Sequence, residues 1–229
     1  MNYQNYRSLE SNKYAPLFCL NALQLQNNII KSNLEIFIVR KETVSQILRH
    51  EIYAEIGKRD LYQTPENVVK LEEFHILTFD TATYEKDIAL IRLPDGYRDL
   101  PSNIVLPEIT IPVEEYKDCS IFGYGSERFL FPIIASLREA PIEIISAEDC
   151  EGALNPYAPD YDSGMFCAGR GVTDACQGDS GSGLICDGGI LVGIVSYGSS
   201  CGVPGLPGVY TNVQYHREWI EKQIAQGNI

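Results

Sequence analysis

Residues 176–184 read Cys-Gln-Gly-Asp-Ser-Gly-Ser-Gly-Leu, and this stretch decides how the rest of the chain is interpreted. Ser180 is flanked by glycines, so it can sit on a tight turn with its hydroxyl exposed. Glycines also let neighbouring backbone N–H groups converge on one point, as stabilisation of an oxyanion requires. A bare Gly-x-Ser-Gly occurs in many ordinary turns, but the leading Cys176 and the adjacent Asp179 make this pattern far more specific.

The composition narrows the possible partners. The chain has 229 residues, with 18 Lys and Arg against 31 Asp and Glu, which gives a net charge of −13. Such an acidic chain repels phosphate backbones and anionic lipid surfaces, so neither nucleic acid nor a membrane is an expected partner. No Cys-x-x-Cys pair and no histidine cluster occurs, so neither a metal nor another cofactor is predicted.

Short apolar or alternating runs broken by Gly, Pro, Asn and Asp predict an all-β barrel or sandwich. The expected strands are Glu35–Arg40, Ile52–Ile56, Val68–Leu77, Ile88–Leu93, Ser120–Tyr124, Ile142–Ile145, Gly164–Ala168, Ser182–Cys186, Ile190–Tyr197 and Gly208–Val213. From Gln214 onward, Tyr215, Trp219, Ile220 and Ile224 recur at helical spacing, which predicts one C-terminal helix packed on the last strand.

Six of the seven cysteines lie between residues 119 and 201. This density predicts three disulfides and an extracellular location, although spacing alone does not choose the pairs. Cys19 is left over, either as a buried free thiol or as half of a disulfide whose partner is missing. Residues 1–15 lack the basic and apolar segments of a signal peptide.

Further motifs surround the serine stretch in a fixed order. They are Asp-Ile-Ala-Leu at 87–90, Cys-Ser-Ile-Phe-Gly-Tyr-Gly at 119–125, Met-Phe-Cys-Ala-Gly at 165–169, Ser-Tyr-Gly at 196–198 and Pro-Gly-Val-Tyr-Thr at 207–211. With these motifs, the chain from about Tyr53 to its C-terminus resembles the chymotrypsin/trypsin family of serine proteases. The resemblance implies an all-β fold of two antiparallel six-stranded barrels, the first incomplete, with a C-terminal helix.

The resemblance also implies roles for individual residues. Ser180 would be the nucleophile, Asp87 would orient a histidine, and the N–H groups of Gly178 and Ser180 would form the oxyanion hole. Asp174 would lie at the base of the specificity pocket. Substrate binding would also involve Ser196 and two glycines without side chains in the pocket wall, Gly198 and Gly208.

An acidic pocket base implies cleavage of protein or peptide substrates after Arg or Lys, and protein inhibitors are possible partners. The family further implies three disulfides, namely Cys119–Cys186, Cys150–Cys167 and Cys176–Cys201.

The sequence departs from the family at its histidine. The expected Ala-Ala-His-Cys motif is absent, and counting back from Gly57 without gaps reaches Gln46. Its loss would also leave Cys19 without a mate. Of the three histidines, His50 would need a four-residue deletion to serve as base. His75 is expected on the surface or an edge strand, and His216 is expected to be solvated.

A second departure concerns Asp179, which the family pairs with an α-amino group released before Ile-Val-Gly-Gly. That sequence is absent here. We expect residues 1–50 to be an unrecognised segment and residues 51–229 to be the trypsin-like domain. Two functions remain open: a trypsin-like endopeptidase that is catalytically impaired or incompletely represented in this sequence, and a non-catalytic homologue that binds a partner through the retained site.

Overall fold

A computed structural model describes residues 104–169 and 173–226 without a break. Before residue 104 it describes the strands at 29–31 and 35–39, the ranges 52–56, 60–64, 67–71, 73–77 and 82–92, and positions 80 and 94. Gln46, His50 and Cys19 lie outside the described residues, as does most of the predicted N-terminal segment.

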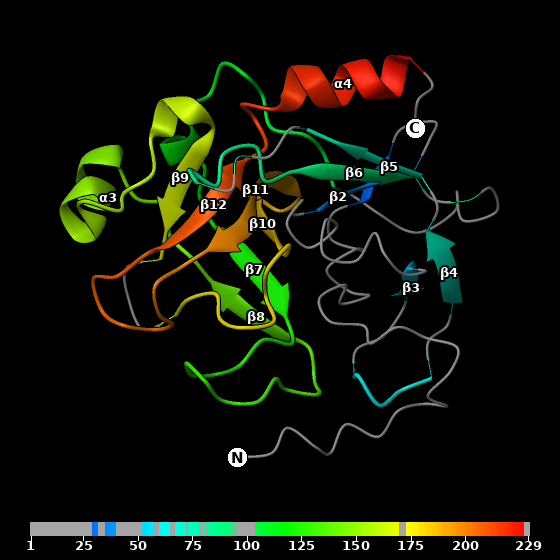
Figure 1. The fold of residues 1–229 in the computed structure, drawn as a ribbon, viewed down its shortest axis with the longest axis horizontal. Coiled ribbons are helices and arrows are strands. Elements are labelled where there is room, and N and C mark those ends of the chain that lie inside the picture. The colour runs from blue at the N-terminus through cyan, green and yellow to red at the C-terminus, as the bar shows by residue number, and fades with distance from the viewer. Residues whose placement is uncertain are drawn as a thin grey trace.

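The second half of the chain forms one antiparallel sheet of six strands, in the order β8-β7-β10-β11-β12-β9 (Figure 1). The strands are β7 (Ser120–Gly123), β8 (Arg138–Pro141), β9 (Met165–Ala168), β10 (Gly183–Cys186), β11 (Ile190–Tyr197) and β12 (Gly208–Asn212). Phe166 and Tyr210 stack in the core with ring centroids 5.7 Å apart, and both are fully buried. This sheet carries the serine stretch at the entry to β10.

The first half contributes two smaller sheets. One has four strands in the order β1-β2-β6-β5, and the other pairs β3 with β4. The strands are β1 (Ile29–Lys31), β2 (Glu35–Val39), β3 (Ile52–Ile56), β4 (Asn67–Leu71), β5 (Glu73–Ile76) and β6 (Ala89–Arg92). β6 is almost wholly buried, which explains its uninterrupted apolar run.

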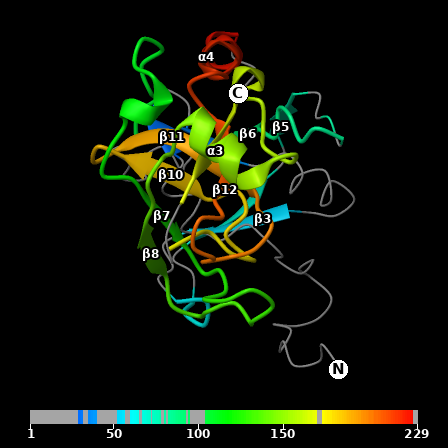
Figure 2. The ribbon, with the colours of Figure 1, turned by 90° about the vertical axis from the view of Figure 1, so that its left-hand side faces the viewer.

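Two α-helices and two 3-10 helices complete the described structure. α3 (Ala147–Leu154) begins at Ser146, whose Oγ accepts a hydrogen bond from the Asp149 N–H at 3.1 Å. The 3-10 helices are η1 (Val113–Glu115) and η2 (Tyr161–Ser163). α4 (Arg217–Ala225) lies across one end of the molecule, as Figures 1 and 2 show from two directions.

The core under α4 joins the two halves. Ile220 of α4 packs in one buried cluster with Leu90 of β6 and Ile194 of β11. The helix therefore covers strands from both halves, rather than the last strand alone as the sequence suggested. It also begins later than predicted, at Arg217, and the side chain of Tyr215 is exposed.

The predicted all-β class with a C-terminal helix is confirmed. Two predicted strands are wrong. The run Val68–Leu77 is split between β4 and β5, which belong to different sheets, because the chain passes from one sheet to the next at this point. The run Ile142–Ile145 forms a single bridge, from Ile144 to Ala168, and is buried by packing rather than by a strand ladder.

Three disulfides cross-link the second half: Cys119–Cys186, Cys150–Cys167 and Cys176–Cys201. These are the pairs that the resemblance implies. Among the described residues, neither helix has the length and apolar character needed to cross a membrane. The described residues also contain no cluster of three or more side chains suited to holding a metal ion.

Candidate active site

Asp87 immediately precedes the buried end of β6 and is itself fully buried. The hydroxyl of Ser196, on β11, donates a hydrogen bond to the Asp87 Oδ2 at 2.8 Å. The hydroxyl of Thr211, on β12, donates to the Asp87 backbone oxygen at 3.0 Å. Asp87 of the first half is therefore held by two side chains of the second half, Ser196 at its carboxylate and Thr211 at its backbone oxygen, which are 109 and 124 residues away in sequence.

The serine stretch folds into a tight turn before β10. The Asp179 N–H donates to the Cys176 oxygen and the Ser182 N–H to the Asp179 oxygen, each at 2.9 Å. Gly178 has φ +101°, in the left-handed region that favours glycine. The turn holds Ser180 half-buried. The flanking glycines thus serve the backbone geometry that the sequence suggested.

The side chain of Asp179 points back into the protein. Its carboxylate accepts hydrogen bonds from the Gly125 N–H at 2.9 Å and from the Cys176 N–H at 3.0 Å. Burial raises the pKa of Asp179, and the two amide hydrogen bonds oppose that rise. A Cβ on Gly125 would lie 2.1 Å from a carboxylate oxygen, so this contact requires glycine. Sequence reasoning did not single out Gly125, although it belongs to the quoted 119–125 motif.

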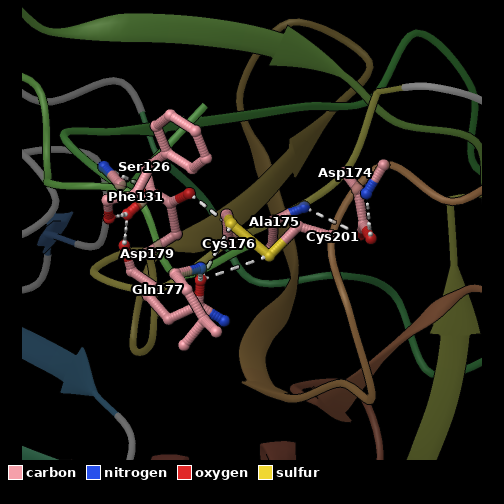
Figure 3. The surroundings of a disulfide bond; sticks show 11 residues. Ser126, Phe131, Asp174, Ala175, Cys176, Gln177, Asp179 and Cys201 are labelled. Atoms are coloured by element: carbon pink, nitrogen blue, oxygen red, sulfur yellow. Dashed lines mark hydrogen bonds between the residues drawn. A yellow bond between two sulfur atoms is a disulfide. The ribbon is translucent and has the colours of Figure 1, made fainter. Parts of the chain in front are cut away.

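Asp174 lies across the Cys176–Cys201 disulfide from Asp179 (Figure 3). Its carboxylate accepts hydrogen bonds from the Ala175 N–H at 2.8 Å and the Gly202 N–H at 3.1 Å. Burial raises the pKa of Asp174 from 3.8 to about 6, against the effect of these hydrogen bonds. The carboxylate is thus held by two backbone amides, each in a residue adjacent to one of the two bridged cysteines.

Of the two glycines predicted in the pocket wall, Gly208 adjoins Asp174, and Gly198 adjoins Gly208. A Cβ on Gly208 would lie 3.4 Å from the Asp174 Oδ1, and a Cβ on Gly198 would lie 3.8 Å from the Gly208 Cα. Neither position therefore adds a side chain next to the carboxylate. Tyr210 was not singled out from the sequence. Burial, followed by the charge of Asp174, raises the pKa of its hydroxyl, which has no hydrogen-bond partner among the described residues.

The two described histidines lie in different environments. His75 is half-buried on β5, the edge strand of its sheet, which confirms the expectation for it. His216 directly precedes α4 and is only 4% exposed, so the prediction that it is solvated is wrong. Its ring meets the Tyr215 ring edge-on, with centroids 5.1 Å apart. Burial, followed by the charge of Lys86, lowers the pKa of His216 from 6.5 to about 4.

Comparison with known proteins places these features in a family. The profile of the trypsin family matches residues 43–220. Human testisin is 38% identical over 62% of this chain and 49% of its own length, and human transmembrane protease serine 11A is 38% identical over 64% and 37%. Serine protease 56 of Mus musculus is 36% identical over 65% of this chain and 26% of its own.

The matched part of the chain thus spans between about a quarter and a half of each of these relatives. The family match covers most of this chain, including the buried aspartate, the serine turn and the three disulfides. The chain belongs to the trypsin family of serine proteases.

Proposed function

We propose that this chain carries the substrate-recognition site of a serine endopeptidase that acts after Arg or Lys. The observation that carries the proposal is Asp174, a carboxylate anchored by the Ala175 and Gly202 amides and bordered by glycines. A long cationic side chain could pair with this carboxylate through charge-assisted hydrogen bonds. The orphaned Tyr210 hydroxyl beside it supplies a further polar partner for such a ligand.

In the proposed reaction, the Ser180 Oγ attacks the carbonyl carbon of the peptide bond. Its proton passes to an imidazole, the carbonyl oxygen becomes negative, and the Gly178 and Ser180 N–H groups stabilise that charge. The C–N bond then breaks, and the imidazole returns the proton to the leaving amine. Asp87, fixed by Ser196, orients the imidazole.

The missing Ala-Ala-His-Cys motif limits turnover by the chain as it stands. A serine hydroxyl is a weak nucleophile without an adjacent base, and loss of the base in a related triad costs on the order of a millionfold in turnover. His216 is the buried N-cap residue of α4, and burial, followed by the charge of Lys86, lowers its pKa and favours the neutral ring. We therefore propose that the chain retains recognition and is impaired in catalysis.

The alternative function is a non-catalytic homologue that binds a basic protein segment at Asp174. The same anchored carboxylate favours it, because recognition of a cation needs no base. For either function we propose an extracellular location and polypeptide partners, protein inhibitors among them. The three disulfides support that location, since such bonds persist in oxidising compartments.

The test is binding of p-aminobenzamidine, a fluorescent cation, to the wild-type protein and to Asp174→Asn. We expect wild-type binding to weaken as the pH falls below about 6, where Asp174 gains its proton, by up to about tenfold per pH unit. Asp174→Asn should bind weakly at every pH. Equal binding by the two proteins would overturn the assignment of Asp174.

Turnover separates the two functions. An arginine ester should show no hydrolysis above that of Ser180→Ala if the chain is impaired, and an organophosphonate should not label Ser180 at the rates of an active protease. The variant Gln46→His restores an imidazole at the position that the ungapped count reaches. A gain of Ser180-dependent turnover in that variant would favour the endopeptidase over the non-catalytic homologue.

A further inference from the structure

Three tyrosine side chains are more than half exposed among the described residues. The exposed fractions are 90% for Tyr62, 78% for Tyr157 and 54% for Tyr215. A buried tyrosine usually hydrogen-bonds its hydroxyl, whereas an exposed phenol is open to an enzyme that modifies it. The charges near these three side chains differ, and this difference distinguishes Tyr157.

Tyr157 lies in a strongly acidic part of the chain. No lysine, arginine or histidine occurs between Arg138 and Arg170. The acidic residues of this stretch are Glu139, Glu143, Glu148, Asp149, Glu151, Asp160 and Asp162. Such a concentration of one charge attracts cationic surfaces and repels anionic ones.

The other two exposed tyrosines have basic neighbours. Arg59 closely precedes Tyr62, and Arg217 closely follows Tyr215. A cationic surface that approaches either tyrosine therefore meets a charge of its own sign. Of the three exposed tyrosines, Tyr157 is the one without a nearby cation in the sequence.

Negative charge also gathers in space around the connection between α3 and η2, which carries Tyr157. Burial raises the pKa of Tyr161, the first residue of η2, to about 12, against the hydrogen bond from the Cys167 amide. The charges of Glu114 on η1 and Asp149 on α3 add to this rise. Carboxylates from two other elements therefore lie near the start of η2.

The connection that carries Tyr157 is fixed at both ends. The Tyr157 N–H donates to the Leu154 oxygen at 2.6 Å, at the end of α3. The Asp162 N–H donates to the Asp160 Oδ1 at 2.9 Å, at the start of η2. In Figure 1, α3 lies at the edge of the second half, on the side away from β3 and β4. The Tyr157 side chain is thus exposed on a short, anchored connection at the surface.

Tyr161 shares the acidic surroundings but not the exposure. Its hydroxyl donates to the Ile145 oxygen at 3.1 Å and accepts from the Cys167 N–H at 2.9 Å. Because these bonds occupy the hydroxyl, it is not available to an enzyme while the protein is folded. Tyr157 therefore combines an exposed side chain with acidic neighbours, whereas Tyr62 has only the first property and Tyr161 only the second.

We propose that Tyr157 is a site of O-sulfation by a transferase of the secretory compartment. A transferase that binds an anionic sulfuryl donor needs a cationic active site. An acidic segment is attracted to such a site, and a lysine or arginine beside the tyrosine is repelled from it. The compartment rests on the extracellular location proposed above. The choice of Tyr157 rests on its exposure and on the charges of its neighbours.

The reaction is a transfer of a sulfuryl group from phosphoadenosine phosphosulfate. The Tyr157 Oη attacks the sulfur, and the Oη–S bond forms as the bond from sulfur to the bridging phosphate oxygen breaks. The phenol proton passes to a base of the transferase, the adenosine bisphosphate leaves, and nothing is oxidised or reduced. The sulfate ester adds a lasting negative charge to a surface that is already acidic.

The test supplies both the donor and the transferase. The folded full-length protein is incubated with a detergent extract of Golgi membranes and phosphoadenosine phosphosulfate that carries radioactive sulfur, and peptide mass spectrometry locates the label. We expect sulfate at Tyr157. Tyr157→Phe should lose nearly all incorporation, whereas Tyr62→Phe should retain it. Protein that is reduced and unfolded beforehand should also accept sulfate at Tyr161.

A second pair of variants tests the contribution of charge. Asp160→Asn with Asp162→Asn removes two carboxylates near Tyr157 while keeping a side-chain oxygen that can hold the start of η2. The initial rate of sulfation should fall by about tenfold, because electrostatic attraction to the transferase is weakened. The matched control is Glu218→Gln with Glu221→Gln on α4, which changes the net charge equally and should leave the rate unchanged.

The inference is overturned if the folded protein accepts no sulfate while an acidic tyrosine peptide in the same extract does. It is also overturned if Tyr157→Phe keeps the label, or if the two double variants react at the same rate. The test requires neither a ligand at Asp174 nor turnover at Ser180, so its outcome is independent of the proposed reaction. Since the donor and the transferase are added, failure would not reflect the location of the protein.

Discussion

The two halves of the molecule are held together by different means. The second half is a continuous six-stranded sheet with three disulfides. The described strands of the first half form two smaller sheets, and no disulfide joins described residues there. The first half nevertheless supplies Asp87, whose carboxylate is fixed by Ser196 and whose backbone oxygen is bonded by Thr211. The candidate site therefore depends on how the halves meet, and not on either half alone.

The meeting surface has two parts. One is the apolar cluster in which Ile220 of α4 contacts the strands of both halves, and the other is the pair of hydrogen bonds to Asp87. Apolar burial supplies most of the free energy of such a contact, and the hydrogen bonds fix its geometry. Substitutions within one half and substitutions at this surface should therefore change the free energy of unfolding by different amounts.

Reduction of the disulfides should have the largest effect. The bridges close loops of 67, 17 and 25 residues. In the chain-entropy account each contributes about 3–4 kcal/mol, so their loss removes on the order of 10 kcal/mol of unfolding free energy. Urea unfolding followed by the fluorescence of Trp219, the single tryptophan, with and without reductant measures this. An unchanged midpoint would mean that the sheet alone holds the second half.

Acid should lower the free energy of unfolding through His216, at the start of α4. His216 is buried and its pKa is lowered from 6.5 to about 4, so the folded state favours the neutral ring. The contribution of the neutral His216 ring to the free energy of unfolding is complete above pH 6.5. It declines as the pH falls toward 4, by roughly 3 kcal/mol in total.

Unfolding midpoints measured between pH 7 and pH 4 test this for wild type and His216→Phe. The variant should show a flatter profile over that interval. His75→Gln, on the edge strand β5, is the control and should keep the wild-type slope. If His216→Phe retains that slope, another group causes the acid sensitivity.

The contributions of the two hydrogen bonds to Asp87 to the free energy of unfolding should depend on the charge of the acceptor. Ser196→Ala removes a donor to a buried carboxylate and should cost about 2 kcal/mol, whereas Thr211→Val removes a donor to a neutral carbonyl and should cost about 1 kcal/mol. Chemical denaturation of the two variants checks the order. A reversed order would mean that the Asp87 carboxyl draws its main support from elsewhere.

The smallest effect is a stabilisation within the second half. Gly152 lies in α3, and a Cβ there would meet nothing within 4 Å. Gly152→Ala should therefore raise the unfolding free energy by about 0.5–1 kcal/mol, because alanine favours the helix. Gly188 has equally open surroundings but φ +76°, so Gly188→Ala should destabilise instead. Thermal melts of both variants separate helix propensity from backbone strain.

The sequence predicted most strands of both halves, and one prediction failed in each half: Val68–Leu77 in the first and Ile142–Ile145 in the second. Ile52–Ile56 and Ile190–Tyr197 match β3 and β11 residue for residue, because each run is apolar or β-branched and bounded by turn residues. Val68–Leu77 failed because periodicity does not show where a chain leaves one sheet for another. The burial of His216 and of the Tyr210 hydroxyl could not be predicted, since both depend on elements that are distant in sequence.

Roles at the candidate site divide in the same way. The turn around Ser180 follows from its local glycines, whereas the role predicted for Asp174 comes from the family resemblance and not from any local pattern. The Gly125 contact with Asp179 spans 54 residues and leaves no local signal. Such contacts become visible only when the sheet has brought the two segments together.

That contact has a consequence for which substitutions the chain can accept. The Asp179 carboxylate occupies the volume that any side chain at position 125 would fill. Even a methyl group at position 125 would therefore displace the carboxylate. Displacing Asp179 would also break its bond to the Cys176 amide and so deform the peptide units that lead to Ser180. The lack of a side chain at Gly125, which is remote in sequence from Ser180, is thus a steric requirement for forming the turn.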